Sequence, residues 1–214
     1  MRIICLASAK GGVGKTSLAA SLGVAAHQAG EKAFLIDMDA QGSLYNWGMR
    51  RTVDEPAIDR TTADKLEPAL AGVKAAGYTV AILDTAGVDT ASTSAAMRVS
   101  DLTIIPARPS ALDIEASRPT VAALSRLNRP FVFVLNMCPP GRSNRPGDAA
   151  RALSLLGALA VPFIIHRQAH VDSIGLGRGV TEHDDPRAAE EIRQLWHWVK
   201  RRIEGKHGQT AAVA

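Results

Sequence analysis

Short, continuous apolar runs alternate along this chain with longer segments in which apolar residues recur every three or four positions. A short aliphatic run is typical of a buried strand, whereas the longer spacing is typical of an amphipathic helix. The runs predict strands at residues 2–8, 32–38, 78–84, 101–106, 130–136 and 159–165. The helical spacing predicts helices at residues 15–29, 62–76, 91–99, 111–127, 146–157 and 186–204. Regular alternation of the two predicts an α/β fold with a doubly wound, mainly parallel sheet and helices on both faces.

The composition agrees with one domain of this kind. The chain has 214 residues, of which 46% are hydrophobic and only 4% aromatic, so aliphatic side chains must supply most of the core. We expect a single domain over residues 1–205 and a flexible tail over residues 206–214. Met1 leads almost directly into the first predicted strand, so we expect no signal peptide. The longest nearly apolar run, "LSLLGALAVPFII", is too short to span a bilayer. Because Cys5 and Cys138 lack the spacing of a disulfide framework or a metal site, we expect a cytoplasmic protein.

The stretch "CLASAKGGVGKTSLAA", residues 5–20, joins the first predicted strand to the first predicted helix. Backbone N–H groups at a helix N-terminus are unpaired and carry partial positive charge, so an anion is stabilised there. Glycines just before the helix let the backbone approach phosphate oxygens closely. In this setting Lys15 would neutralise phosphate charge and the Thr16 hydroxyl would hold Mg²⁺. The alternative is a glycine-rich turn with solvated lysines. The predicted nucleotide-binding residues of this stretch are Lys10, Gly11, Gly12, Val13, Gly14, Lys15, Thr16 and Ser17.

Three aspartates end predicted strands at the edge of the sheet where this loop lies. Asp37 and Asp39, in "FLIDMDAQG", point the same way because side chains alternate along a strand. Two carboxylates beside a nucleotide suit one structural role and one water-positioning role. Asp84 ends the apolar strand "VAILD", which can deliver one carboxylate to Mg²⁺. The alternative for Asp37 and Asp39 is that both cap the following turn.

The fifth predicted strand ends in "FVFVLNMCPPG" and bears on base specificity. A guanine-binding [NT]KxD box requires an aspartate where this chain has Pro139, which disfavours a guanine reader of that type. Asn136 remains, and its amide can both donate and accept, which suits the N6 and N7 edge of adenine. The alternative is that Asn136 ends the strand and starts a turn.

The segment "KGGVGKT" departs from the pattern GxxxxGK[ST], whose first glycine would fall on Ala9, and begins with a lysine instead. Together with "DMDAQG" and "VAILDTAG", it resembles the ParA/MinD family of deviant Walker A P-loop ATPases. The resemblance extends from residue 3 to about residue 195 and is greatest with small ParA-type partition ATPases that lack an N-terminal DNA-binding domain. Two positions depart from the family pattern. Ala40 stands where the family usually has proline, and "TAG" stands where partition ATPases commonly have "TPP".

The resemblance implies ATP and Mg²⁺ as the ligands and assigns a role to the additional lysine. Lys10 would reach across a sandwich dimer to the nucleotide of the partner subunit, and Lys15 would act on the nucleotide of its own subunit. Asp39 would orient the attacking water. Asp37 would support the loop and the magnesium shell, and Asp84 would complete that shell together with Thr16.

Two later stretches extend the resemblance. "IIPARPSALDIEAS", residues 104–117, resembles the family segment that leads into a helix near the dimer face. Asp113 is expected to be the N-cap of that helix, with a role in coupling ATP to dimerisation as the alternative. "VPFIIHRQAHVDSIGLGRGV" resembles the last strand and the loop over the nucleotide, which makes Arg167 a candidate nucleotide contact. Because His166 and His170 lack helical metal-ligand spacing, we expect them to be surface or turn residues.

The resemblance further implies an ATPase that forms an ATP-dependent homodimer, binds DNA without sequence preference, and partitions or positions a plasmid, a chromosome region or a large protein complex. Its slow hydrolysis would be stimulated by a ParB-like adaptor, and it would be nucleoid-associated. The formal charge of +4 and the pI near 9.3 favour this reading. The candidate phosphate contacts are Arg50, Arg51, Arg142, Arg145, Lys200, Arg201 and Arg202.

Three alternatives remain open. The basic residues can be a solvated surface and nothing more. A MinD-like, membrane-associated regulator of division placement is disfavoured because the ending "KHGQTAAVA" has no bulky apolar face. A metabolic P-loop enzyme acting on a small molecule lacks a recognisable acceptor cluster.

Overall fold

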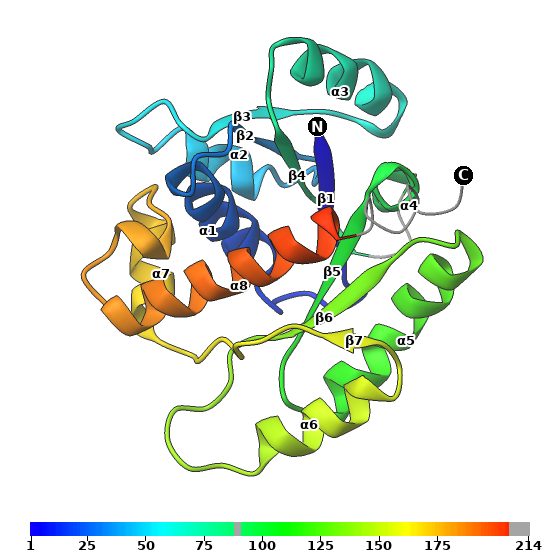
Figure 1. Ribbon diagram of the computed structural model, residues 1–214, viewed down its shortest axis with the longest axis vertical. Coiled ribbons are helices and arrows are strands. Elements are labelled where there is room, and N and C mark those ends of the chain that lie inside the picture. The colour runs from blue at the N-terminus through cyan, green and yellow to red at the C-terminus, as the bar shows by residue number, and fades with distance from the viewer. Residues whose placement is uncertain (88–90, 206–214) are drawn as a thin grey trace.

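The structure, a computed structural model, describes residues 1–87 and 91–205 (Figure 1). Within these residues the centre is a seven-stranded sheet in the order β3-β2-β4-β1-β5-β6-β7, and every strand pair is parallel. The strands are β1 (Arg2–Leu6), β2 (Ala33–Asp37), β3 (Ala57–Arg60), β4 (Val80–Asp84), β5 (Leu102–Ala107), β6 (Phe131–Leu135) and β7 (Ala158–Leu159). The predicted doubly wound sheet is therefore confirmed, and it is wholly parallel.

Helices cover both faces of the sheet (Figure 1). One face carries α1 (Lys15–Gln28), α2 (Ser43–Gly48), α7 (Gln168–Gly175) and α8 (Pro186–Glu204). The other carries α3 (Leu66–Ala75), α4 (Ala91–Val99), α5 (Ala111–Arg126) and α6 (Arg145–Ser154). Two short 3₁₀ helices, η1 (Ala63–Lys65) and η2 (Val180–Glu182), precede α3 and α8. Because strands β1, β4 and β5 are covered on both faces, they are almost entirely apolar.

Helix α8 forms as its sequence predicts. Asp185 caps it by accepting hydrogen bonds from two backbone N–H groups of the first turn, and Pro186 occupies a position where no N–H is needed. An apolar stripe along this helix, which includes Leu195 and Trp196, is buried against α1 and the sheet. The stripe is thus the core face of the helix.

The structure differs from the prediction in four elements. The sequence analysis missed β3, α2 and α7, each of which is short. The strand predicted at residues 159–165 pairs with β6 only at Ala158 and Leu159, and resumes as a single bridge between Cys138 and Ile165. Pro162 has no N–H to donate to a ladder, which accounts for the interruption. The tail predicted at residues 206–214 lies outside the described residues.

Candidate functional site

The glycine-rich loop follows β1 and leads into α1 as predicted. Gly14 is the N-cap of α1 with φ of +89°, and Gly12 has φ of +69°. Both values lie in the left-handed region, which glycine adopts without a Cβ penalty. Helix α1 begins at Lys15, so the unpaired N–H groups of its first turn belong to the loop and to the residues just after it. The loop therefore has the backbone conformation that an anion site requires.

Asn136 lies against this loop. The residue is 6% exposed, and its Nδ2 donates a hydrogen bond of 2.8 Å to the carbonyl oxygen of Val13. A Cβ built at Gly14 would lie 2.4 Å from the same Nδ2. With Nδ2 committed to the loop, Oδ1 is the end of the amide that remains as an acceptor. Asn136 thus holds the loop in addition to any contact with a base.

Three of the predicted magnesium-site residues meet beside the loop. The Thr16 hydroxyl hydrogen-bonds with the Asp84 carboxyl group, and the charge of Asp37 also acts on that group. Asp84 is 1% exposed, and its Oδ1 is buried without a hydrogen-bond partner. Burial is the main cause that raises the pKa of Asp84 to about 7, against the lowering effect of the Thr16 hydrogen bond. A buried, unpartnered carboxylate oxygen of this kind fits a cation.

Asp37 and Asp39 have different surroundings. Both oxygens of the buried Asp37 accept backbone hydrogen bonds, from the N–H of Asp39 at 2.9 Å and from the N–H of Tyr45 at 2.8 Å. Asp39 is partly buried, and its Oδ1 accepts from the N–H of Gln41 at 3.0 Å. Asp37 therefore fixes the loop after β2. Asp39 lies two residues further along the chain and is more exposed than Asp37.

Lys10 is bound within its own subunit. Its Nζ lies 2.7 Å from Oδ2 of Asp113, which also accepts from the Ser110 hydroxyl at 2.5 Å. The other oxygen, Oδ1, accepts from Nε of Arg108 at 3.0 Å. Burial alone would raise the pKa of Asp113, but the hydrogen bonds from Lys10, Ser110 and Arg108 outweigh it and lower that pKa to about 2. The Asp113 carboxylate is thus fully charged and fully paired.

The prediction that Asp113 caps α5 is wrong. The N-cap is Ser110, whose side chain accepts a hydrogen bond of 3.2 Å from the backbone N–H of Asp113. The hydroxyl of Ser110 satisfies the helix N-terminus, and Asp113 one turn later is therefore available for Lys10. No local pattern signals this pairing because 103 positions separate the two residues.

Two cavities adjoin the site. The first, which we call the Asp39 cavity, has a volume of about 500 Å³ and is lined by residues that include Asp37, Asp39, Arg60, Thr61, Lys65 and Ser92. The second, which we call the α7 cavity, has a volume of about 190 Å³ and is lined by residues that include Ser17, Asn136, Met137, Arg167, His170 and Ile174. The predicted residues Asn136 and Arg167 are therefore brought together at one cavity, although β7 and α6 separate them in the sequence.

The α7 cavity also corrects the interpretation of one histidine. His166 is exposed as expected, but His170 is partly buried in α7 and its Nε2 is inaccessible to solvent. Burial is the main cause that lowers the pKa of His170 from its ordinary value. Arg167 borders the cavity while its guanidinium pairs with Glu191 at 2.7 Å and with Asp185 at 3.8 Å. The sequence analysis expected His170 at the surface or in a turn because it did not predict α7.

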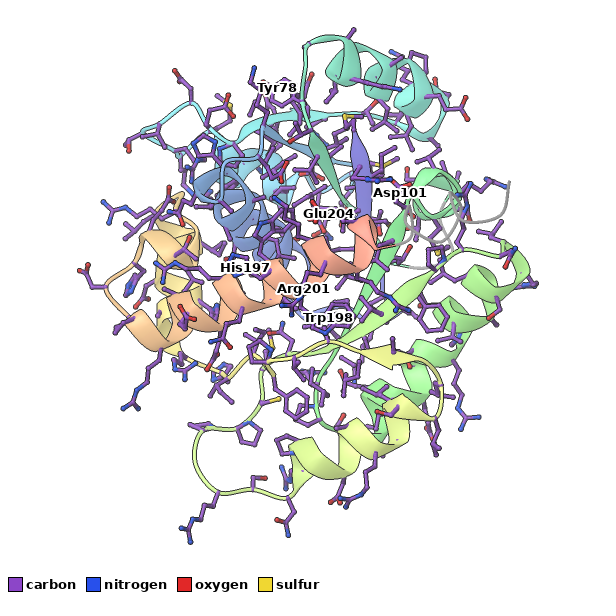
Figure 2. The ribbon with its side chains drawn as sticks, viewed as in Figure 1. Tyr78, Asp101, His197, Trp198, Arg201 and Glu204 are labelled. Carbon is purple, nitrogen blue, oxygen red and sulfur yellow. The ribbon has the colours of Figure 1, made fainter. Side chains whose placement is uncertain are left out.

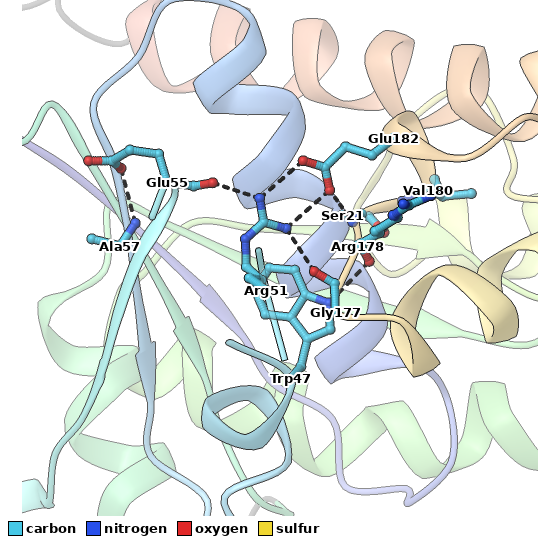
Figure 3. Close-up of polar contacts among 10 residues, drawn as sticks. Ser21, Trp47, Arg51, Glu55, Ala57, Gly177, Arg178, Val180 and Glu182 are labelled. Atoms are coloured by element: carbon cyan, nitrogen blue, oxygen red, sulfur yellow. Dashed lines mark hydrogen bonds and ion pairs between the residues drawn. The ribbon is translucent and has the colours of Figure 1, made fainter. Parts of the chain in front are cut away.

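Two of the seven basic candidates belong to a contact between distant segments, and Figure 3 shows one of them, Arg51. Arg51, with 4% of its side chain exposed, donates to both carboxylate oxygens of Glu182 and to the carbonyl oxygens of Gly177 and Glu55. The neighbouring Arg50 donates to the carbonyl oxygen of Ile174 at 3.3 Å. The prediction that Arg51 contacts nucleic-acid phosphates is therefore wrong. Its buried guanidinium joins the end of α2 to the segment after α7.

The other basic candidates divide into paired and exposed residues. Lys200 pairs with Glu31 at 2.5 Å and with Glu204 at 4.0 Å, so its charge is largely compensated within the chain. Arg201 and Arg202 are exposed in the last turn of α8, and Figure 2 shows Arg201 near His197 along this helix. Arg145 is exposed at the first position of α6, and Arg142 is exposed in the loop just before it. Exposure leaves these four arginines accessible to a polyanion.

No helix in residues 1–87 or 91–205 is both long and apolar enough to cross a membrane. Across the same part of the chain, no group of three or more His, Cys, Asp or Glu side chains forms a metal site. Mg²⁺ commonly uses one or two carboxylates together with substrate phosphates and water, so the pair Thr16 and Asp84 agrees with that mode.

The sheet is parallel, and a glycine-rich turn follows its first strand. A lysine and a threonine open the next helix, and an aspartate ends the adjacent strand. These features define the P-loop class of nucleotide-binding proteins. The comparison with known families identifies the branch. Residues 4–176 match the family described as the CobQ/CobB/MinD/ParA nucleotide binding domain. The chain belongs to this family.

Individual relatives agree with that assignment. The Maintenance of carboxysome distribution protein A of Gloeobacter kilaueensis is 29% identical over 210 residues, which are 91% of this chain and 95% of the relative. The Chromosome partitioning protein ParA of Caulobacter vibrioides is 31% identical over 151 residues, 65% of this chain and 48% of the relative. The chain thus spans about half the length of the ParA relatives that it matches.

Solved structures support the fold. The cell division ATPase MinD of Pyrococcus furiosus superposes with a TM-score of 0.76 at 19% identity, over 94% of this chain and 99% of that chain. The apo McdA structure from Cyanothece gives a TM-score of 0.75 at 17% identity, over 93% and 99% of the two chains. At these identities the likeness establishes the arrangement of helices and strands only.

Proposed function

We propose that this protein is an ATPase that dimerises around two ATP molecules and uses their hydrolysis to partition or position a cargo. The observation that carries the proposal is the place of Lys10. It lies at the start of the glycine-rich loop, and Asp113 of α5 holds its ammonium group 2.7 Å away. Lys15 already opens helix α1 and supplies the cation that a phosphate loop requires. Lys10 is therefore a second cation, which becomes available for another subunit's nucleotide once it leaves Asp113.

Adenine is the base that Asn136 favours. Because Nδ2 of Asn136 donates to the carbonyl oxygen of Val13, Oδ1 is left to accept a hydrogen bond from a ligand. The exocyclic amino group of adenine donates such a bond, whereas guanine presents a carbonyl oxygen at the corresponding position. The α7 cavity, which Asn136 and Arg167 border, is the proposed base site.

Mg²⁺ fits the residues beside the loop. Thr16 and Asp84 would hold it, and the unpartnered Oδ1 of Asp84 supports this assignment. The ion, when bound, neutralises charge on the phosphate oxygens. Asp37 holds the segment after β2 through its two backbone hydrogen bonds and does not need to contact the metal directly.

Hydrolysis requires an oriented water and a compensated phosphate charge. Asp39 borders the Asp39 cavity beside Asp37, and its carboxylate is the group that orients the water. Lys15 and the partner subunit's Lys10 would stabilise the charge that develops on the phosphate. To reach the partner, Lys10 must leave Asp113, so dimerisation replaces an internal ion pair with one to ATP.

The positioning role is supported by a relative that matches over most of both chains. The match to the Maintenance of carboxysome distribution protein A covers 91% of this chain and 95% of that relative. Nonspecific DNA is the proposed surface on which the dimer moves, contacted by the exposed arginines Arg142, Arg145, Arg201 and Arg202. A ParB-like adaptor would stimulate hydrolysis, and the protein would be cytoplasmic and nucleoid-associated.

The proposal is tested with Asp39→Ala. This variant should bind ATP and DNA normally, hydrolyse ATP at least 100-fold more slowly, and remain on DNA for a correspondingly longer time, since one general base contributes about 10²–10⁴-fold. A matched surface control is Asp184→Ala, whose carboxylate is exposed and distant from the loop in sequence. Normal turnover in Asp39→Ala, or DNA affinity that does not decline with added salt, would contradict the proposal.

A further inference from the structure

The segment that follows Asp39 is a tight turn. The carbonyl oxygen of Asp39 accepts a hydrogen bond of 3.0 Å from the N–H of Gly42, which places Ala40 at the second position of a four-residue turn. Proline is favoured at that position because its ring presets φ. Alanine does not fix φ, so the turn that begins at Asp39 lacks the backbone constraint that a proline at residue 40 would supply.

Arg60 supplies contacts at this turn. It is the last residue of β3 and pairs in register with Asp37 of β2. Its Nη2 donates a hydrogen bond of 3.0 Å to the carbonyl oxygen of Ala40, and a longer one of 3.4 Å to that of Asp39. One guanidinium group thus bridges the two carbonyls on either side of the residue that could have been proline.

Packing reinforces these hydrogen bonds. Cζ of Arg60 lies 5.9 Å from the ring centroid of Tyr45, and the N–H of Tyr45 donates to Asp37. Gly42 has φ of +66°, and a Cβ built there would lie 3.1 Å from Cζ of Arg60. The guanidinium therefore sits directly against the bare backbone of the turn. Within residues 1–87 and 91–205, Arg60 forms no ion pair with a carboxylate, so the turn and Tyr45 account for its placement.

We propose that Arg60 is a positioning residue for ATP hydrolysis, which holds the turn at residues 39–42 and so directs the Asp39 carboxylate at the attacking water. The proposal rests on the proposed function, in which Asp39 orients that water. Arg60 acts through the backbone of residues 39 and 40, to whose carbonyl oxygens its guanidinium group donates. Its loss therefore lowers the rate of the chemical step and leaves the binding of ATP unchanged.

The test compares single and double variants by phosphate release at saturating ATP and by ATP titration. Arg60→Met keeps an apolar chain over Tyr45 and removes the donors; we expect kcat to fall about tenfold with KM and thermal midpoint unchanged. Arg60→Lys, which restores one donor group, should recover part of the loss. Ala40→Pro in the Arg60→Met background should bring kcat to within about threefold of wild type, because proline restores the constraint on the turn. Lys74→Met is the matched control, since Lys74 is exposed on α3 and does not line the Asp39 cavity.

Each outcome decides the proposal. An unchanged kcat in Arg60→Met overturns it, and so does a rise in KM without a fall in kcat. Failure of Ala40→Pro to restore a lowered kcat also overturns it, because Arg60 would then act other than through the turn. The assay of Asp39→Asn distinguishes failure of the proposed function from failure of the role assigned to Arg60. Normal turnover in that variant contradicts the proposed function itself, whereas a large loss there with no effect of Arg60→Met contradicts only the role of Arg60.

Discussion

The ion pair between Lys10 and Asp113 predicts how much stability one carboxylate contributes. Asp113→Asn keeps the shape of the side chain and removes the charge that accepts from Lys10, Arg108 and Ser110. The pKa of Asp113 is lowered from its ordinary value of 3.8 to about 2. This lowering of the pKa corresponds to about 2 kcal/mol of native-state stabilisation at neutral pH. Only 2% of this side chain is exposed, so solvent screening reduces that value little.

The dependence on pH follows from the direction of the shift. Because the folded-state pKa is depressed, the stabilisation is complete above the unfolded-state pKa and is lost as pH falls through the folded-state pKa. Asp113→Asn should therefore lower the free energy of unfolding by about 2 kcal/mol at pH 7. The difference from wild type should shrink to about half at pH 3. Urea denaturation at a series of pH values measures both quantities.

The control is Asp148→Asn. Asp148 also lies in the first turn of a helix and pairs with an arginine, Arg151, but both side chains are largely exposed. An exposed pair contributes about 0–1 kcal/mol, so this variant should differ little from wild type. A loss in Asp113→Asn no larger than in Asp148→Asn, or a difference that stays constant from pH 7 to pH 3, would refute the reasoning.

Three further predictions concern the loop and the contact between distant segments. Arg51→Met should lower the free energy of unfolding by about 3–5 kcal/mol because it leaves buried acceptors unpaired, whereas Arg50→Met, measured in the same urea titration, should cost less than about 1 kcal/mol. Asp84→Asn should raise the free energy of unfolding of the nucleotide-free protein by about 2–4 kcal/mol at pH 8, because the charged carboxylate is destabilised by burial. That gain should vanish near pH 4, where the wild-type carboxyl is protonated, and the same variant should lose magnesium-dependent hydrolysis. Gly14→Ala should abolish ATP binding in a fluorescence titration, because a methyl group would strain φ of +89° and displace Asn136; retained affinity would contradict the assigned loop geometry.

The strands and helices with strong patterns were predicted correctly because their burial is uniform. Strands β1, β4 and β5 are buried on both faces, so continuous apolar runs identify them. Helix α8 runs for 19 residues with one apolar stripe, and its predicted bounds match the structure. The glycine-rich loop at residues 10–16 could likewise be placed before α1, because the residues that define it are consecutive in the sequence.

The missed elements are short or lie at the sheet edge. Strand β3 has four residues, of which only two are apolar, and α2 has six residues. Neither length is enough for a periodic pattern to stand out from its neighbours. Arg51 shows the same limit for side chains: its partners on η2 and after α7 are more than 120 positions away. A sequence shows that such a residue is charged, and only the fold shows that it is buried.

The sequence indicated which residues belong to the candidate site, but it did not indicate which of them contact one another. Thr16, Asp37 and Asp84 were predicted as a group because parallel strands bring their carboxyl ends to one edge. Asp113, the internal partner of Lys10, was predicted to cap α5 because aspartate and serine both suit a helix N-terminus. In the structure Ser110, which directly precedes the helix, is the cap. Long-range ion pairs of this kind have no periodic signature.

The central claim is that Lys10 acts on the nucleotide of a second subunit, and sedimentation velocity in ATP and Mg²⁺ tests it most directly. Wild-type protein should sediment as a dimer with ATP and as a monomer without it. Lys10→Ala should bind ATP with near wild-type affinity and remain monomeric, and Lys15→Ala should bind no ATP at all. A Lys10→Ala variant that forms the ATP-dependent dimer as well as wild type, or that loses ATP binding as completely as Lys15→Ala, would contradict the account.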